Sequence, residues 1–118
     1  MARIDATVTA TDKGGAFKLT IDKPEIKVPP GKHQIVFKLD DQTTSGPTTF
    51  DTADPIFHAK GTNCPSSGKS CPELTVDGCT AALLTLGDNN GGPATMSYQL
   101  NFKYRNKKEQ LDPIIINQ

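Results

Sequence analysis

The sequence predicts an all-β fold, an antiparallel two-sheet sandwich of about seven to nine strands in one domain spanning residues 1–118. Several segments alternate between apolar and polar residues, as strands with one buried face do. Ten Gly and nine Pro residues favour turns between short strands over long helices. A chain of 118 residues has the usual size of a single domain with one core.

The N-terminal third predicts a hairpin, an edge strand and a central strand. Apolar residues alternate with polar ones over 4–11 and again over 17–21, and the Gly-containing turn at 12–15 joins the two as a hairpin. Residues 26–28 lie between prolines, which lack the amide hydrogen of a central strand, so we expect an edge strand there. Residues 33–39 predict a central strand. Its apolar face would carry His33, Ile35, Phe37 and Leu39.

Two polar segments in the middle of the chain predict long loops. Residues 40–54 and 61–73 are rich in Ser, Thr, Gly, Pro and Asp, which favour turns and irregular backbone. Short strands are expected at 56–60, between the two loops, and at 74–76, after the second.

The C-terminal third contains the clearest strand pattern. A turn is expected at 77–78, and the apolar run 79–86 predicts one buried strand, with one short helix as the alternative. The alternation over 95–105 predicts a half-buried antiparallel strand. Its buried face would carry Met96, Tyr98, Leu100, Phe102 and Tyr104. Residues 106–111 are expected to turn before a last short strand at 113–116.

The charges of the chain balance, with 13 Lys and Arg against 13 Asp and Glu. No net positive charge attracts nucleic acid or anionic lipid over a distance, so we expect neither as a partner. No stretch approaches the roughly 20 apolar residues of a membrane helix. A basic run near the C-terminus predicts a solvated turn, with a phosphate-binding patch as the alternative. It consists of Lys103, Arg105, Lys107 and Lys108.

The sequence leaves the cellular compartment open. The N-terminus, Met1-Ala2-Arg3-Ile4-Asp5, lacks the apolar core of a signal peptide. A cytoplasmic protein is expected if Met1 is native. A periplasmic or secreted protein is expected if a signal peptide was removed.

Three cysteines, Cys64, Cys71 and Cys79, lie close together in the sequence. A disulfide between Cys64 and Cys71 would stabilise the fold by about 2–3 kcal/mol in an oxidising compartment and would leave Cys79 as a small apolar group. Three reduced structural thiols are the alternative. A further hypothesis adds His58, so that three thiolates and one imidazole form a tetrahedral zinc site. These residues lack the closely spaced pairs that structural zinc sites use.

No catalytic constellation is recognisable in the sequence. His33 is expected to be a residue at the rim of the core, and neither His33 nor His58 has a Ser, Cys or carboxylate at a spacing that predicts a triad. Asx-rich turns explain the loop aspartates without a ligand. There is no nucleophile elbow and no phosphate or nucleotide motif. We therefore expect neither an enzyme activity nor a cofactor.

Two segments resemble known families. Residues 24–39, PEIKVPPGKHQIVFKL, resemble the opening strands of cupredoxin-like and immunoglobulin-like sandwiches, where a Pro-Gly-marked edge strand precedes a buried central strand. This resemblance implies the scaffold and not the copper site, because Cys79 is not followed by His or Met at the cupredoxin spacing. The ending Asp112-Pro113-Ile114-Ile115 is similar to small uncharacterised bacterial proteins of the DP-EP family, which imply no activity and no functional residues.

These features predict a non-catalytic binding or structural interaction module whose partner is an unidentified protein or small ligand. The polar loops 40–54 and 61–73 would carry recognition, because loops on a rigid scaffold often do. The alternative is a small-molecule or metal-binding protein. It would use His58, Cys64, Cys71 and Cys79. An edge strand near Ile26 or Ile114 could also pair with a second copy to form a homodimer.

Overall fold

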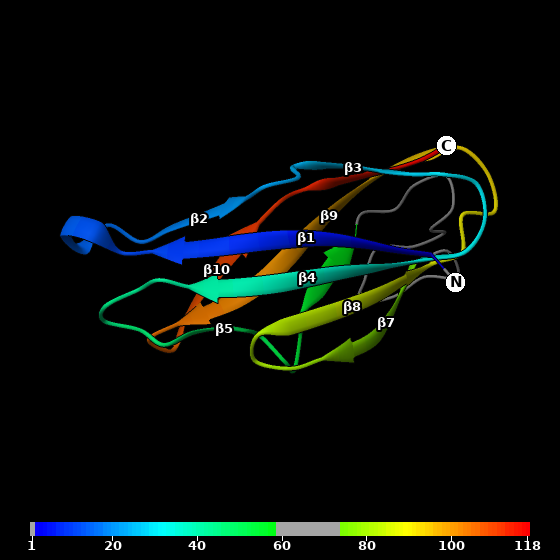
Figure 1. Ribbon diagram of the computed structural model, residues 1–118. Coiled ribbons are helices and arrows are strands. Elements are labelled where there is room, and N and C mark those ends of the chain that lie inside the picture. The colour runs from blue at the N-terminus through cyan, green and yellow to red at the C-terminus, as the bar shows by residue number, and fades with distance from the viewer. Residues whose placement is uncertain (1, 59–73) are drawn as a thin grey trace.

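The computed structural model describes residues 2–58 and 74–118, which form two packed β-sheets (Figure 1). The first sheet has the strand order β2-β1-β4-β8-β7. Its strands are β1 (Ala2–Thr11), β2 (Lys18–Ile21), β4 (His33–Asp41), β7 (Leu74–Cys79) and β8 (Leu83–Asp88). The second sheet is built around β9. Its strands are β3 (Glu25–Val28), β5 (Thr48–Phe50), β6 (Ile56–His58), β9 (Ala94–Tyr104), β10 (Lys107–Leu111) and β11 (Ile114–Asn117). The predicted all-β sandwich is confirmed.

The described residues contain 11 strands, more than the seven to nine expected, because β5 and β10 form in segments predicted as a loop and a turn. β10 and β11 pair with β9 in one continuous register, and only Asp112-Pro113 separates them. Pro113 has no amide hydrogen to donate to β9. β5 and β6 both pair with β9 as well, and residues 51–55 divide them.

Two strand pairs are parallel, so both sheets are mixed, whereas the sequence analysis expected antiparallel sheets. β1 is parallel to β4, and β3 is parallel to β11. After the β1–β2 hairpin the chain crosses from the first sheet to the second as β3 and then returns as β4 beside β1 (Figure 1). Alternation of apolar residues reports which face is buried, and it carries no information about strand direction.

The core lies between the sheets and contains the apolar residues that alternation predicted. On β9, Met96, Tyr98, Leu100 and Phe102 are buried, and Tyr104 is half-buried. The largest fully buried side chains come from both sheets. They are Phe37, Phe50, Phe102, Ile26, Ile35, Ile56, Leu74, Leu84, Leu86, Leu100 and Ile115. Among the described residues, no helix is long and apolar enough to cross a membrane.

The apolar run 79–86, predicted as one buried strand, is divided by a turn into the end of β7 and the start of β8. Other strands hold this turn. The amide of Leu39 donates to the carbonyl oxygen of Ala82 at 2.9 Å, and the amide of Phe50 donates to that of Ala81 at 2.9 Å. Tertiary hydrogen bonds therefore stabilise a turn that contains none of the usual turn residues.

The predicted edges and turns are confirmed only in part. β3, which contains Ile26, is an edge strand as expected, but β11, which contains Ile114, lies between β9 and β3 and offers no free edge. The predicted turn at Asp77-Gly78 is a β-bulge within β7. Residues 107–111, expected to turn, form β10 because they continue the hairpin with β9. The predicted loop 40–54 contains the short strand β5.

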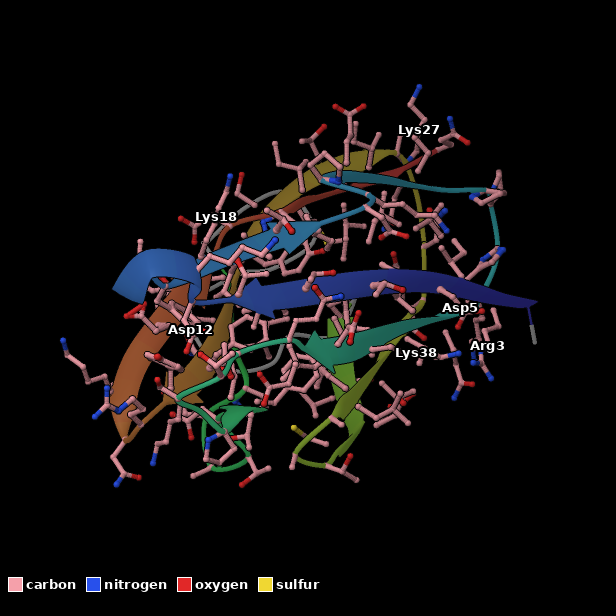
Figure 2. All side chains as sticks on the ribbon, turned by 60° about the vertical axis from the view of Figure 1, so that its left-hand side comes forward. Arg3, Asp5, Asp12, Lys18, Lys27 and Lys38 are labelled. Carbon is pink, nitrogen blue, oxygen red and sulfur yellow. The ribbon has the colours of Figure 1, made fainter. Side chains whose placement is uncertain are left out.

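A buried carboxylate organises the end of the sandwich where the 3-10 turn η1 (Lys13–Gly15) meets the β4–β5 connection and the β9–β10 turn (Figure 2). Asp12 accepts hydrogen bonds from the amides of Thr44 and Ser45 at 2.8 and 2.9 Å, and from the Tyr104 hydroxyl at 2.8 Å. The two backbone amides are the main cause that lowers the pKa of Asp12 to about 2. Loop 40–54, which the sequence analysis expected to carry recognition, thus uses the amides of Thr44 and Ser45 for structural hydrogen bonds to Asp12.

A second polar cluster closes the opposite end, where both ends of the chain lie (Figure 1). Oδ1 of Asp88 accepts hydrogen bonds from the Asn90 amide at 2.9 Å and from Nδ2 of Asn117 at 3.0 Å. Nδ2 of Asn90 donates to the carbonyl oxygens of Val28 and Pro29 at 3.0 and 2.7 Å. The cluster links β8 in the first sheet to β3 and β11 in the second, and its Asx turn is of the kind that the sequence predicted.

Candidate functional site

The predicted cysteine and histidine site falls only in part within the described residues. Cys64 and Cys71, and therefore their predicted disulfide, lie outside them. His58 is the last residue of β6 in the second sheet, whereas Cys79 is the last residue of β7 in the first. Where the structure describes side chains, no three His, Cys, Asp or Glu residues gather to hold a metal ion, and the side chain of His58 lies outside that part of the chain. A metal site at these four residues stays a prediction.

Cys79 is a half-buried free thiol. Burial raises its pKa, and the negative charge of Asp51 raises it further. A thiol with a raised pKa is a poor nucleophile and a poor metal ligand at neutral pH. Its surroundings are those of a small apolar residue that packs against the core, as the sequence analysis expected.

His33 has the position that the sequence predicted, at the rim of the core. It begins β4 and is buried. Its Nδ1 lies 2.9 Å from the carbonyl oxygen of Gly31, which fixes the ring against the preceding turn. The side chain is thus held by local backbone, as a structural residue at the rim would be.

The outer face of the first sheet is a solvated surface of mixed charge (Figure 2). Nε of Arg3 donates to Oδ1 of Asp5 at 2.7 Å, and both side chains are about half exposed. Lys38 lies nearby on the neighbouring strand β4 (Figure 2). Exposed pairs of this kind contribute little to stability, so this face is suited to control substitutions.

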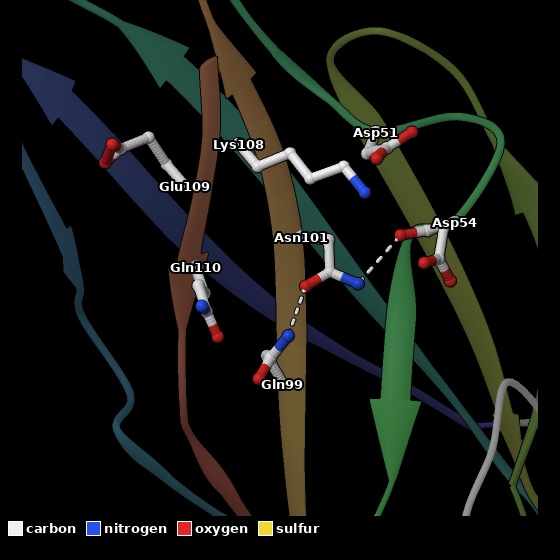
Figure 3. A pocket seen from close by; sticks show the side chains of 7 residues that line it. All are labelled: Asp51, Asp54, Gln99, Asn101, Lys108, Glu109 and Gln110. Carbon is white, nitrogen blue, oxygen red and sulfur yellow. Dashed lines mark hydrogen bonds between the residues drawn. The ribbon is translucent and has the colours of Figure 1, made fainter.

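The outer face of the second sheet holds a polar hollow of about 110 Å³, called the β9 groove below (Figure 3). Because Tyr98 and Leu100 point into the core, the residues that alternate with them point outward. The groove lies over β9 between the β5–β6 connection and β10. It is lined by Asp51, Asp54, Gln99, Asn101, Lys108, Glu109 and Gln110.

Hydrogen bonds fix the amide side chains of the groove (Figure 3). Nε2 of Gln99 donates to Oδ1 of Asn101 at 2.7 Å, and Nδ2 of Asn101 donates to the carbonyl oxygen of Asp54 at 2.9 Å. Each amide keeps further donor or acceptor capacity beyond these bonds. The groove is therefore ordered before any ligand arrives, which lowers the entropic cost of binding.

Asp51 forms a wall of the groove. Its backbone amide donates to the carbonyl oxygen of Asn101 at 2.9 Å, and its carbonyl oxygen accepts from the amide of Asp54 at 3.0 Å. The residue is only 4% exposed, yet its carboxylate accepts no hydrogen bond from any residue that the structure describes. Figure 3 shows the Lys108 ammonium extending toward Asp51 and Asp54, while Glu109 points away.

An apolar hollow of about 190 Å³ adjoins the β9 groove and shares Gln99 with it. Phe57, which lies opposite Gln99 in the β6–β9 pair, forms its main apolar surface and is 45% exposed. Ser97, Tyr98 and Asp112 complete the lining. An exposed aromatic ring thus lies on the same sheet face as the ordered amides.

A third hollow, of about 530 Å³, opens at the end of the sandwich that Asp12 organises. Phe17 and Tyr104 stack there with ring centroids 4.3 Å apart, so each ring covers a face of the other. Arg105 and Lys107, from the predicted basic run, line this hollow around a two-residue hairpin turn. The Tyr104 hydroxyl donates a hydrogen bond to Asp12, so this polar contact at the hollow supports the fold.

Sequence reasoning missed the β9 groove. The alternation of β9 did place Gln99 and Asn101 on the solvent face, which is the one signal that pointed toward it. Asp51 lay in a predicted loop, Lys108 in a predicted turn, and Phe57 in a strand of unknown pairing. Only the arrangement of β5, β6 and β10 around β9 brings these residues together.

The groove contains donors, acceptors and an adjacent aromatic ring. None of its lining residues in the described structure is a Ser, Thr, Cys or His that could act as a nucleophile or imidazole base. Comparison with protein-family models finds no family that matches the chain, and comparison with curated proteins finds no match.

Proposed function

We propose that this protein is a non-catalytic binding module whose binding surface is the β9 groove together with Phe57. The observation that carries the proposal is the Asp51 carboxylate, which borders an ordered polar hollow on a residue that is only 4% exposed and accepts no hydrogen bond from the described residues. Its oxygens border the hollow and keep their acceptor capacity. A ligand in the groove can therefore donate to Asp51.

The surroundings of Asp51 support binding rather than chemistry. Ligand sites commonly combine apolar surface with a few oriented polar groups, and Phe57 and the Gln99–Asn101 pair supply both. The strands that carry these residues belong to a closed core, so the site is held on a rigid scaffold. The proposed module differs from the loop-based one that the sequence predicted, because its residues lie mainly on a sheet face.

We also infer that the sandwich is cupredoxin-like in strand arrangement. Immunoglobulin-type sandwiches consist of two antiparallel sheets. The parallel pairs β1–β4 and β3–β11 favour the cupredoxin-like alternative. Backbone contacts between Ile4 and Ile35, which lie opposite each other in the β1–β4 pair, would support this arrangement in an NMR structure.

The test is an NMR titration of ¹⁵N-labelled protein with a mixed panel of neutral oligosaccharides, amino acids, nucleotides, and short acidic and basic peptides. We expect at least one class to shift the side-chain amide signals of Gln99 and Asn101. The side-chain amide of Gln34, on the first sheet, is the internal control and should not move. Shifts confined to Gln34 and its neighbours, or no shift from any class, would contradict the proposal.

A further inference from the structure

We propose that the ligand of the β9 groove is a neutral carbohydrate, with a sugar hydroxyl donating to Asp51 and an apolar sugar face packing on Phe57. This inference rests on the proposed binding function and adds the chemical class of the ligand. It combines the buried acceptor, the ordered amides and the exposed aromatic ring into one recognition surface.

The charges around the groove disfavour anionic ligands. Among the described residues that line it, Asp51 and Asp54 carry negative charge, Glu109 points away from the groove, and Lys108 alone carries positive charge (Figure 3). A phosphate, a nucleotide or an acidic peptide would meet like charges. This distribution agrees with the balanced charge of the whole chain, which attracts no polyanion.

The position of Lys108 also disfavours a cationic ligand. Its ammonium extends toward Asp51 and Asp54, into the space that a lysine or arginine side chain of a basic peptide would need to occupy (Figure 3). A neutral polyol avoids both repulsions. Each of its hydroxyl groups can donate to a carboxylate and accept from an ammonium or amide at the same time.

The groups of the groove match this dual character. Asp51 is an acceptor, Lys108 is a donor, and the amide of Gln99 provides both. Phe57 lies on the same face as Gln99, so an apolar face of a sugar ring can pack on it while the hydroxyls reach the polar side. Outward residues of one strand repeat at about 7 Å, which lets the surface contact successive units of a chain.

The test uses isothermal titration calorimetry of the full chain with cellohexaose, maltohexaose and chitohexaose, and with hexalysine as the competing class. Asp51→Asn keeps the side-chain volume and should weaken sugar binding by about tenfold or more. Phe57→Ala should weaken it by about five- to tenfold. Two control variants on the first sheet should leave it unchanged. They are Gln34→Ala, which removes an amide, and Leu83→Ala, which removes a similarly exposed apolar side chain.

The outcomes separate the ligand class from the binding function. Binding of at least one oligosaccharide, with losses in Asp51→Asn and Phe57→Ala only, supports the proposal. Binding of hexalysine without any oligosaccharide, weakened by Asp51→Asn, overturns the carbohydrate class and leaves the binding function standing. Sugar binding that both groove variants retain places the ligand elsewhere and overturns the site. Absence of binding by every probe overturns the ligand class, and together with a silent NMR panel it overturns the binding function as well.

Discussion

Replacement of Asn90 by Gly should remove the side-chain link from the β8–β9 connection to β3, at the end of the sandwich where both ends of the chain lie (Figure 1). Asn90 donates through Nδ2 to the carbonyl oxygens of Val28 and Pro29, and Val28 is fully buried. Asn90 has φ of 39°, a left-handed conformation that Gly adopts without strain. The substitution therefore deletes the side-chain hydrogen bonds and leaves the backbone path available.

The magnitude follows from those two bonds. Each lost hydrogen bond costs about 1 kcal/mol. The Val28 carbonyl keeps the Gln118 amide as a donor at 2.9 Å, so it is not left unpaired. We expect Asn90→Gly to lower the free energy of unfolding by about 1–2 kcal/mol, out of the roughly 5–15 kcal/mol of a typical domain. The melting temperature should fall by about 5 °C.

Urea unfolding followed by circular dichroism measures this change. Asn106→Gly is the matched control, because Asn106 also has positive φ, at 65°, but lies exposed in the β9–β10 turn. The control should change the free energy of unfolding by less than about 0.5 kcal/mol. Equal stability of Asn90→Gly and the wild-type protein would refute the reasoning, because the Nδ2 contacts would then contribute nothing.

Other contacts of the fold give four further predictions. Hydrogen bonds lower the pKa of Asp12 to about 2, so the stabilisation from its carboxylate is present above the unfolded pKa of about 3.9 and is lost as the pH falls toward 2. Urea midpoints should therefore fall less steeply between pH 7 and pH 2 in Asp12→Asn than in the wild-type protein, and an unchanged pH dependence would argue against this role of Asp12. Gly46→Ala would place a Cβ 2.3 Å from Oγ1 of Thr43 and 3.0 Å from the amide nitrogen of Thr48, so unfolding should show a loss of about 1–3 kcal/mol, whereas Gly78→Ala, with open space around its Cβ, should show much less. In a Cys64→Ser/Cys71→Ser variant, Cys79 should react slowly with a disulfide reagent at pH 8, because burial and the charge of Asp51 raise the pKa of its thiol. The further substitution Asp51→Asn should speed this reaction, and equal rates in the two variants would contradict the contribution of Asp51. Asp51→Asn should leave the free energy of unfolding unchanged or raise it by about 1 kcal/mol, and a clear loss would assign Asp51 to the structure.

The sequence predicted those parts of the fold that local periodicity determines. On β9, one face is buried and the other is exposed, as the alternation over 95–105 indicates. On β4, His33, Ile35 and Phe37 are buried as the predicted apolar face requires, and Val36 on the other face is buried as well. These segments were predictable because successive side chains of a strand point to opposite faces, so a strand with one buried face alternates between apolar and polar residues.

The missed features depend on contacts between distant segments. The turn that divides 79–86 contains Thr80, Ala81 and Ala82, and its stability comes from amides of Leu39 and Phe50 that no local pattern reveals. The parallel pairing of β1 with β4 likewise depends on where the intervening strands lie. Local sequence could not identify either feature.

Only part of the candidate site could be predicted from local sequence. The alternation over 95–105 placed Gln99 and Asn101 on the solvent face of β9, where the structure also has them. Asp51, Phe57 and Lys108 come from three other segments, and nothing in their local sequence indicates that they meet. A binding surface assembled across neighbouring strands becomes visible only once strand order and register are known.

The buried aspartates of this protein can be sorted by what their carboxylates contact. Asp12 and Asp88 accept hydrogen bonds from backbone amides and neighbouring side chains, so their burial helps to hold the two ends of the sandwich. Asp51 is as buried as Asp12, but its carboxylate receives no such bond within the described residues and faces a hollow. An acceptor that forms no hydrogen bond inside the described fold and borders a hollow remains available to a ligand. If Asp51→Asn loses ligand while its unfolding midpoint stays or rises, the carboxylate serves binding; if the midpoint falls as it does for Asn90→Gly, Asp51 belongs with the structural group and the β9 groove loses its main support.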